Sequence, residues 1–183
     1  RTNTGVEAVG VYTDVLDAAY TANGNYAVTV IEGDFEIKTA TAGILSAAGG
    51  EWVYDGAAHP ATAEVTGAEG FTIWYSTDGG TTWSETAPSV TNVSEGLVTV
   101  SVKATKTGYT DLTTDDVTLK IKPRLITITV DDKEKFFDEA DPAFTGGITS
   151  GTLVTAGDLG TITYSRTNTG VEAVGVYTDV LDA

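Results

Sequence analysis

The stretch RTNTGVEAVGVYTDVLDA, Arg1–Ala18, decides how this chain is built, because residues 166–183 repeat it letter for letter. Arg166 of the second copy corresponds to Arg1 of the first, so equivalent positions differ in number by 166 − 1 = 165. Self-similarity at a long fixed period is the sequence signature of a tandem array, in which each repeat packs mainly against its neighbours. We therefore predict a chain of repeated modules with this offset as its period.

Turn-forming and small residues between the two copies divide the chain into modules. The small residues of Thr39–Gly43 indicate a first linker, and Pro123 directly follows the strand-like run Val117–Lys122. A proline between two strands fixes one backbone torsion and leaves few free residues, so this second junction should be stiff. The predicted modules are the C-terminal part of one module at residues 1–38, a complete β module at 39–122, and the N-terminal part of the next module at 123–183.

The fold class should be all-β. Val, Ile, Thr and Tyr recur in short alternating runs bounded by Gly, Asn and Asp, which is typical of small β modules. An immunoglobulin-like sandwich and a β-grasp-like sheet with one short helix both fit strands of this length, and Val15–Tyr20 is the candidate for the helix. We expect strands at residues 10–16, 26–30, 35–38, 71–76, 97–102, 117–122, 125–130, 148–153 and 161–164.

The composition excludes several classes of protein. The net charge is −16 and no basic stripe occurs, so nucleic acid is not an expected partner. The absence of cysteine rules out disulfides, thiolate metal sites and thiol nucleophiles. No apolar run reaches the roughly 18 residues of a membrane span, so we expect no membrane insertion in this segment. Each 165-residue unit carries 23 acidic and 9 basic residues, a charge that should oppose lateral clumping of an array.

The segment Ser76–Trp83, STDGGTTW, fits the Asp-box pattern S-x-D-x-G-x-T-W of sialidase propellers. Its Asp and Ser side chains can satisfy turn amides, its glycines permit positive φ, and its tryptophan can cover a hairpin. A sialidase needs several boxes and an arginine cluster for the carboxylate of its substrate, whereas this chain has one box and only Arg1, Arg124 and Arg166. We therefore predict a structural hairpin here and no catalytic residues in the chain.

An acidic run after residue 130 is the best candidate for a metal site. Asp132, Glu134, Asp138 and Asp141 could supply the oxygen ligands that Ca²⁺ prefers. Two lysines interrupt the run and no EF-hand spacing occurs, so a solvated strand edge accounts for the same residues. We expect no cofactor, with calcium at these four carboxylates as the alternative.

The histidine and the aromatic residues of the middle module are the remaining candidates. His59 is the only histidine, and neither a cysteine nor a second histidine accompanies it, so we predict a turn residue and not a zinc ligand or a member of a catalytic triad. Trp74 and Tyr75 could stack on sugar rings. Because neighbouring strand residues point to opposite faces, one of the two should lie in the core and the other should be more exposed.

Two parts of the terminal segments carry a resemblance to a known family. Asp132–Pro142, DKEKFFDEADP, resembles the opening of the YGX-type MBG module, and Asn25–Thr29 with Gly33–Ile37 resembles its closing strands. In that family an aromatic–Gly pair is usual where this chain has Phe137-Asp138. The resemblance implies a repeat architecture in large bacterial surface proteins.

The middle region, with Tyr54-Asp55-Gly56 and His59-Pro60, resembles a related repeat of the same surface proteins. We therefore predict a structural segment of an extracellular stalk, adhesin or filament, on the bacterial cell surface or secreted, that acts as a stiff spacer and is not an enzyme. One alternative is an adhesive module that binds host or cell-wall glycans. The other is an accessory region of a surface glycoside hydrolase.

The duplicated stretch should lie inside a module. A complete module would run from Pro123 to Ser165 and continue into a copy of Arg1–Lys38. The expected partners are therefore neighbouring copies of the same repeat, arranged head to tail, so that the closing strands of one copy complete the module that another begins. Within such a joint the two copies of the stretch would compete for one place in the sheet.

Overall fold

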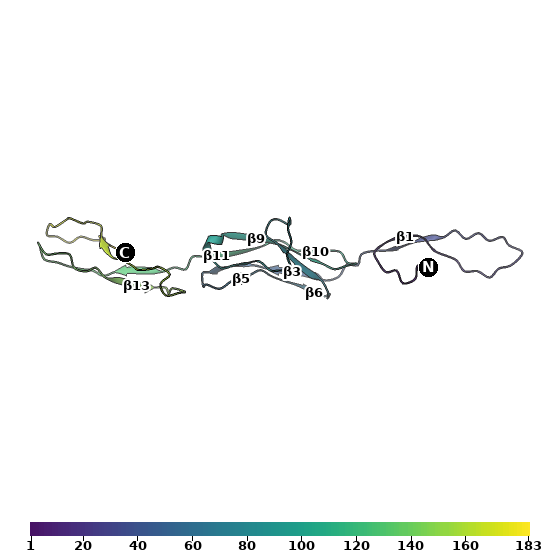
Figure 1. Ribbon diagram of the computed structural model, residues 1–183, viewed down its shortest axis with the longest axis horizontal. Helices are drawn as coiled ribbons and strands as arrows, with labels where there is room; N and C mark the ends of the chain where they lie inside the picture. The colour runs from purple at the N-terminus through teal and green to yellow at the C-terminus, as the bar shows by residue number, and fades with distance from the viewer. The chain divides into compact units, whose positions relative to one another are not determined.

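The computed structural model describes residues 1–183 (Figure 1), which divide into two compact units. Strands supply nearly all of the regular structure, and one 3-10 turn, η1 at Val93–Glu95, is the entire helical content. The predicted all-β class is confirmed. The first unit comprises residues Arg1–Glu51, His59–Val90 and Leu97–Lys120, and the second comprises Trp52–Ala58, Thr91–Gly96 and Ile121–Ala183.

Two paired strands organise the N-terminal part of the first unit. β1 (Gly10–Leu16) runs antiparallel to β2 (Gly33–Ile37), and Tyr12 lies opposite Phe35. The expected strand at residues 26–30 is wrong, because no neighbouring strand is present there to take up its backbone hydrogen bonds. The expected helix at Val15–Tyr20 is also wrong, because its first two residues belong to β1 and the rest form no regular element.

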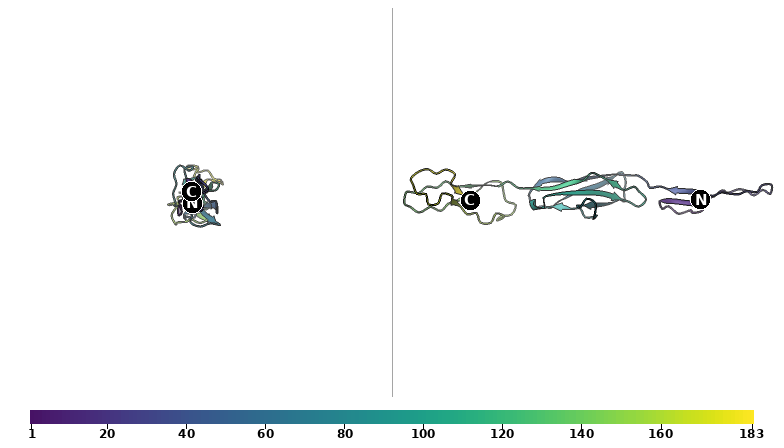
Figure 2. Two further views of the ribbon diagram at one scale, coloured as in Figure 1. Left: turned by 90° about the vertical axis from the view of Figure 1, so that its right-hand side faces the viewer. Right: turned by 90° about the horizontal axis from the view of Figure 1, so that it is seen from above.

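The other strands of the first unit form two layers (Figure 1). In one layer β3 (Ile44–Ala48) pairs with β6 (Thr62–Thr66), and β5 (His59–Pro60) pairs with β8 (Ser89–Val90). In the other layer the long strand β9 (Leu97–Thr105) pairs with β7 (Thr72–Ser76) on one side. On its other side β9 pairs with β10 (Leu112–Thr113) and β11 (Val117–Lys122), and β4 (Gly50–Val53) pairs with β11. The strands lie along nearly one direction in the right-hand view of Figure 2, as in an aligned sandwich.

The buried core lies only within this sandwich. Val100, Val102 and Ala104 alternate along β9, and all three are buried, as are Leu119 and Ile121 on β11. Alternation along each strand thus directs one face of the layer inward. No hydrophobic side chain of residues 1–43 or 122–183 is buried to the same degree. The buried hydrophobic residues of the other layer are Leu45, Ala61 and Val90.

The connections decide between the two predicted folds. The chain enters one layer at β3, crosses to the other at β4, returns for β5 and β6, crosses at β7, returns at β8 and crosses again at β9. Such crossing is typical of sandwiches of the immunoglobulin type. A β-grasp sheet needs a helix packed across it, and no helix longer than η1 is present. The sandwich prediction therefore holds for the strands β3 to β11, where no helix is present for a β-grasp sheet.

The C-terminal part of the second unit consists of two strand pairs. β12 (Thr127–Val130) pairs with β13 (Gly146–Ser150), and β14 (Ser165–Arg166) pairs with β15 (Leu181–Asp182). The expected strand at residues 161–164 is wrong, because backbone pairing begins only at Ser165.

The predicted linker Thr39–Gly43 is held by backbone hydrogen bonds. The Ala40 N–H donates to the Gly108 carbonyl at 2.9 Å, and the Thr110 N–H donates to the Ala40 carbonyl at 2.9 Å. This linker is therefore part of the ordered first unit, while the module boundaries at residues 38 and 122 stay a prediction.

Candidate functional site

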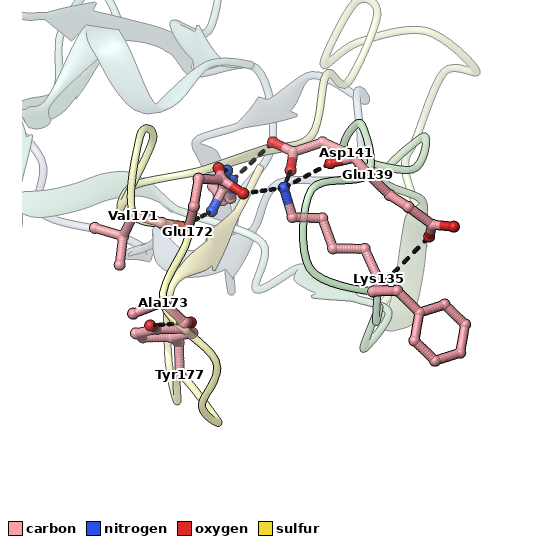
Figure 3. Close-up of polar contacts among 9 residues, drawn as sticks. Lys135, Glu139, Asp141, Val171, Glu172, Ala173 and Tyr177 are labelled. Atoms are coloured by element: carbon pink, nitrogen blue, oxygen red, sulfur yellow. Dashed lines mark hydrogen bonds and ion pairs between the residues drawn. The ribbon is translucent and has the colours of Figure 1, made fainter.

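The duplicated sequence forms the same loop in both of its places. In each copy a threonine N–H donates to a valine carbonyl thirteen residues later and closes the loop, and a tyrosine hydroxyl donates to the carbonyl four residues earlier. An aspartate adopts positive φ in each copy. The threonine bonds are Thr2 to Val15 at 2.8 Å and Thr167 to Val180 at 2.7 Å. The tyrosine bonds are Tyr12 to Ala8 and Tyr177 to Ala173, both at 2.6 Å, and Figure 3 shows the second of them. The φ values are 52° at Asp14 and 56° at Asp179. The stretch therefore encodes its own conformation, and any difference between the copies reports their neighbours.

In the second copy the loop is attached to the rest of its unit by a cluster of four charged side chains, which we call the Arg166 cluster: Lys135, Asp141, Arg166 and Glu172 (Figure 3). Arg166 donates from Nε to Asp141 Oδ2 and from Nη2 to Glu172 Oε1, both at 2.7 Å. Lys135 Nζ lies 3.1 Å from Asp141 Oδ1 and also bonds to Glu172. Each carboxylate thus bridges both cations.

The electrostatics of the Arg166 cluster follow from this alternation of charge. Hydrogen bonds from Lys135, and then from Arg166, hold the pKa values of both Asp141 and Glu172 below their ordinary values. The pKa values of Lys135 and Arg166 are raised, chiefly by their hydrogen bonds to Glu172. All four groups are therefore charged at neutral pH. The side chain of Arg166 is only 12% exposed, so its ion pairs are better shielded from water than ordinary surface pairs.

The turn that presents Lys135 and Asp141 explains one departure from the family pattern. Phe137-Asp138 stands where an aromatic–Gly pair is usual, so Asp138 takes the place of the glycine, and its φ is 71°. Glycine adopts this left-handed conformation freely, and aspartate tolerates it better than most residues. Two hydrogen bonds of 3.2 Å between Phe136 and Glu139 close the turn, one from each backbone N–H. The turn therefore forms without the glycine.

The first copy has different neighbours. Arg1 donates to Glu7 at 2.5 Å, as Arg166 does to Glu172, but the Arg1 guanidinium lies over the ring of Phe35 on β2 at 4.6 Å from the ring centroid. Its Nη1 atom is buried without a hydrogen-bond partner. The same arginine thus meets an aromatic face in one place and two carboxylates in the other.

The calcium candidates do not come together. Asp141 contacts two cations, and no group of three or more side chains that could hold a metal ion gathers in the structure. Lys135, which interrupts the acidic run in sequence, pairs with one of its carboxylates, Asp141. Calcium at these four carboxylates stays a prediction.

The Asp-box prediction of a structural hairpin is confirmed. Tyr75 and Ser84 exchange both backbone hydrogen bonds at 2.8 and 2.9 Å, and Ser76 Oγ accepts from the Gly80 N–H at 2.9 Å. Asp78 accepts from the N–H groups of Thr81 and Thr82 and from the Thr82 hydroxyl. These bonds, above all that from the Thr82 N–H, hold the pKa of Asp78 far below its ordinary value. The Asp78 carboxylate therefore accepts hydrogen bonds that hold the turn.

The two aromatic candidates lie on opposite faces of β7, as predicted. Tyr75 lies opposite the buried Val102, whereas Trp74 lies opposite Lys103 on the outer face and donates to the Thr105 hydroxyl at 3.0 Å. Both side chains are half-buried. Trp74, on the outer face, is therefore better placed than Tyr75 to stack on a sugar.

His59 is not a turn residue. It belongs to β5 and lies opposite Val90, so the predicted turn is wrong. Ala61 donates its N–H to Pro88, and alternation then directs the nitrogen of Pro60 away from β8. A proline fits at such a position because no ladder hydrogen bond is lost.

The Arg166 cluster was not predicted from the sequence. Its members are spread over residues 135–172, and the acidic run by itself indicates only carboxylates and not the cations that pair with them. The available signal was the arginine and glutamate six residues apart that occur in both copies of the duplicated stretch.

No helix of the structure has the length and apolarity to cross a membrane.

Comparison with known families matches residues 126–182 to the MBG domain, YGX type. Neither the curated proteins nor the solved structures contain a match to the chain. The matched segment includes β12 to β15 and the whole Arg166 cluster, and MBG repeats are not a known catalytic family. The resemblance to YGX-type MBG modules is confirmed at residues 126–182.

Proposed function

We propose that the chain is a structural segment of an extracellular bacterial stalk, adhesin or filament, that it acts as a stiff spacer, and that it is not an enzyme. The observation that carries this proposal is the duplicated loop, which closes with the same hydrogen bonds in its two places, Arg1–Ala18 and Arg166–Ala183. An array requires such reuse, because each repeat must present the same surfaces to its neighbours. The MBG match supports the surface location, since the resemblance implies modules of large bacterial surface proteins.

Stiffness is supported by contacts at both predicted junctions. Ala40 is hydrogen-bonded on both sides to residues 108 and 110 within the first unit. Within the second unit, the Arg124 guanidinium donates to the Tyr54 carbonyl at 3.3 Å and to the Thr152 hydroxyl at 3.0 Å. Pro123 precedes this arginine and has a fixed φ. Bending at either junction would therefore break hydrogen bonds.

Measurement of the dimensions of covalent arrays tests the proposal. Arrays of one, two and four 165-residue units should show a maximum dimension in small-angle X-ray scattering that grows linearly with the number of units. A flexible chain would instead grow roughly as the square root of its length. Growth of the maximum dimension as the square root of the number of units would contradict the spacer role.

A matched pair of variants locates the stiffness. Ala40→Pro removes the N–H that donates to Gly108, whereas Ala42→Pro introduces the same residue into the same linker without removing that bond. Arrays with Ala40→Pro should be more compact than arrays with Ala42→Pro. Equal dimensions would show that the bond does not restrain the joint.

Glycan binding is the second candidate, and the outer-face position of Trp74 favours it. Against it, the ring of the neighbouring Trp83 is already covered by Lys103 Nζ, 4.0 Å from the ring centroid. A glycan array with the 165-residue unit discriminates between the roles. Specific, saturable binding that Trp74→Ala abolishes would replace the pure-spacer function. An accessory role in a glycoside hydrolase would instead require a catalytic domain beside one or two units.

A further inference from the structure

The turn at residues 54–56, directly after β4, contacts the segment that follows Pro123, and both belong to the second compact unit. The Tyr54 N–H donates to the Lys122 carbonyl at 2.9 Å, and the Tyr54 carbonyl accepts from Arg124 Nη1 at 3.3 Å. The same guanidinium donates from Nη2 to the Thr152 hydroxyl at 3.0 Å. Hydrogen bonds from a charged donor are stronger than neutral ones. Arg124 therefore joins the turn to the loop after β13.

Gly56 meets the same loop through the space that its missing side chain leaves. A Cβ placed on Gly56 would lie 2.8 Å from Val154 Cγ1, closer than two carbon atoms approach one another in proteins. Valine is stiff at χ1, so this methyl group cannot readily turn away. Gly56 also has a φ of 78°, which glycine adopts without strain. Two separable properties, the contact and the backbone conformation, thus favour glycine at this position.

Both contacting surfaces are held in shape by hydrogen bonds of their own. In the turn, Asp55 Oδ1 accepts from the Ala57 N–H at 2.9 Å. In the loop, the Thr155 N–H donates to Asp158 Oδ2 at 3.1 Å, and the Asp158 N–H donates to the Thr155 carbonyl at 3.2 Å. Surfaces that are already ordered lose little conformational entropy when they meet.

We propose that the turn at residues 54–56 is a docking surface for the loop at residues 152–154 of the MBG-type segment, and that Gly56 and Arg124 latch the junction at Pro123. The surface accepts a β-branched methyl group against a bare Cα, together with a hydroxyl that the guanidinium can reach. The inference rests on the proposed spacer role and deepens it, because it names side-chain contacts that hold the junction in addition to the fixed φ of the proline.

Disulfide trapping tests the contact in the 183-residue chain, which has no cysteine of its own. The Cβ positions of residues 56 and 154 lie at most one carbon–carbon bond beyond the 2.8 Å contact, which is compatible with the roughly 3.5–4.5 Å between the Cβ atoms of a disulfide. In a glutathione redox buffer, Gly56→Cys combined with Val154→Cys should form the disulfide in most molecules, measured by intact mass and by loss of maleimide labelling.

The matched control combines Gly96→Cys with Val154→Cys. Gly96 belongs to the same compact unit and also has positive φ, at 71°, but a Cβ on it would meet nothing within 4 Å. The equilibrium constant for its disulfide should be at least roughly tenfold lower, because the effective concentration of the two thiols is lower. Equal yields for the two pairs would overturn the proposal.

Trypsin cleavage after Arg124 measures opening of the latch. The guanidinium must leave Tyr54 and Thr152 before a protease can bind it, so the cleavage rate follows the population of the open junction. Gly56→Ala crowds the contact and should raise this rate roughly tenfold. Cleavage after Lys38, whose side chain is 75% exposed, is the internal reference in every digest. An unchanged rate after Arg124 would overturn the proposal.

A Val154→Ala background separates the contact from backbone strain, because the Cγ1 atom is then absent. In this background Gly56→Ala should change the cleavage rate by less than about twofold, as expected when two positions act through one contact. An equal increase in both backgrounds would show that position 56 needs glycine only for its φ, and this too would overturn the latch.

Failure of the latch is distinguishable from failure of the spacer role. Both measurements above use a single 183-residue chain, whereas the spacer role is tested on the dimensions of covalent arrays. An untrapped junction in arrays that still grow linearly would refute the latch alone. A trapped junction in arrays that grow as the square root of their length would support the latch and refute the spacer role.

Discussion

The substitution Leu119→Ala tests whether the sandwich around β9 and β11 is the stable part of the molecule. Leu119 is 0% exposed, so removal of its side-chain carbons leaves a cavity that the facing layer cannot fill without moving. Such a change costs about 2–5 kcal/mol. A small domain has a total stability of about 5–15 kcal/mol, so the variant should lose a large share of it. With a slope of about 2 kcal/mol per molar urea, the unfolding midpoint should fall by about 1–2.5 M.

Tryptophan fluorescence during urea unfolding is a clean assay for this region. The three tryptophans, Trp52, Trp74 and Trp83, all lie between residues 39 and 122, so the terminal segments do not contribute. The matched control is Leu97→Ala, because Leu97 lies on the adjacent strand β9 and is 61% exposed. Leu97→Ala should lower the free energy of unfolding by less than about 1 kcal/mol. Equal costs for the two variants, or a loss below about 1 kcal/mol for Leu119→Ala, would refute the assignment of Leu119 to a packed core.

Three further predictions concern the backbone, the Asp box and the charge cluster. Gly49→Ala would place a Cβ 2.2 Å from the Thr118 carbonyl oxygen and should cost about 1–3 kcal/mol in the same urea titration; an unchanged midpoint would contradict the close approach of the two backbones. Asp78→Asn keeps one acceptor oxygen of two, so hydrogen exchange in the Asp-box turn should accelerate while the urea midpoint stays nearly unchanged; unaltered exchange would contradict the role of the carboxylate. In the Arg166 cluster both carboxylates have lowered pKa values in the folded state. Their contribution to the stability of the folded state is therefore full above pH 4.5 and is lost as the pH falls through the lowered pKa values. Amide exchange in residues 166–181, corrected for its intrinsic rate, should rise in that acidic range, and Glu172→Gln should flatten the profile; a flat profile in the unmodified chain would argue against the cluster.

Local patterns in the sequence predicted the elements whose partners lie close in the chain or whose burial alternates strictly. β7, β9 and β11 were expected from β-branched and aromatic runs, and the Asp-box hairpin from its turn chemistry. The same reasoning failed at residues 26–30, where the alternation is equally good but no neighbouring strand is present. Alternation indicates that a segment can be a strand, and only a neighbour makes it one.

The candidate site, too, was only partly predictable from local sequence. The acidic run around Asp141 was visible in the sequence, but its cations come from Lys135 and from Arg166, 25 residues after Asp141. A carboxylate-rich stretch looks like a metal site until the fold supplies the opposite charges. Trp74 and Tyr75 were correctly placed on opposite faces, because that depends only on the two-residue period of a strand.

By itself, the sequence determined the period of the repeat, the all-β class and the hydrogen bonds that close the duplicated loop, which form in both of its surroundings. Tertiary structure alone decided what each copy of that loop contacts. In one place the arginine meets Phe35 of a neighbouring strand, and in the other it meets Asp141, while its bond to the glutamate of the loop, Glu7 or Glu172, is present in both. The physical reason is that the loop is closed by hydrogen bonds within its own eighteen residues, whereas strand pairing and ion pairs depend on groups that only folding brings near.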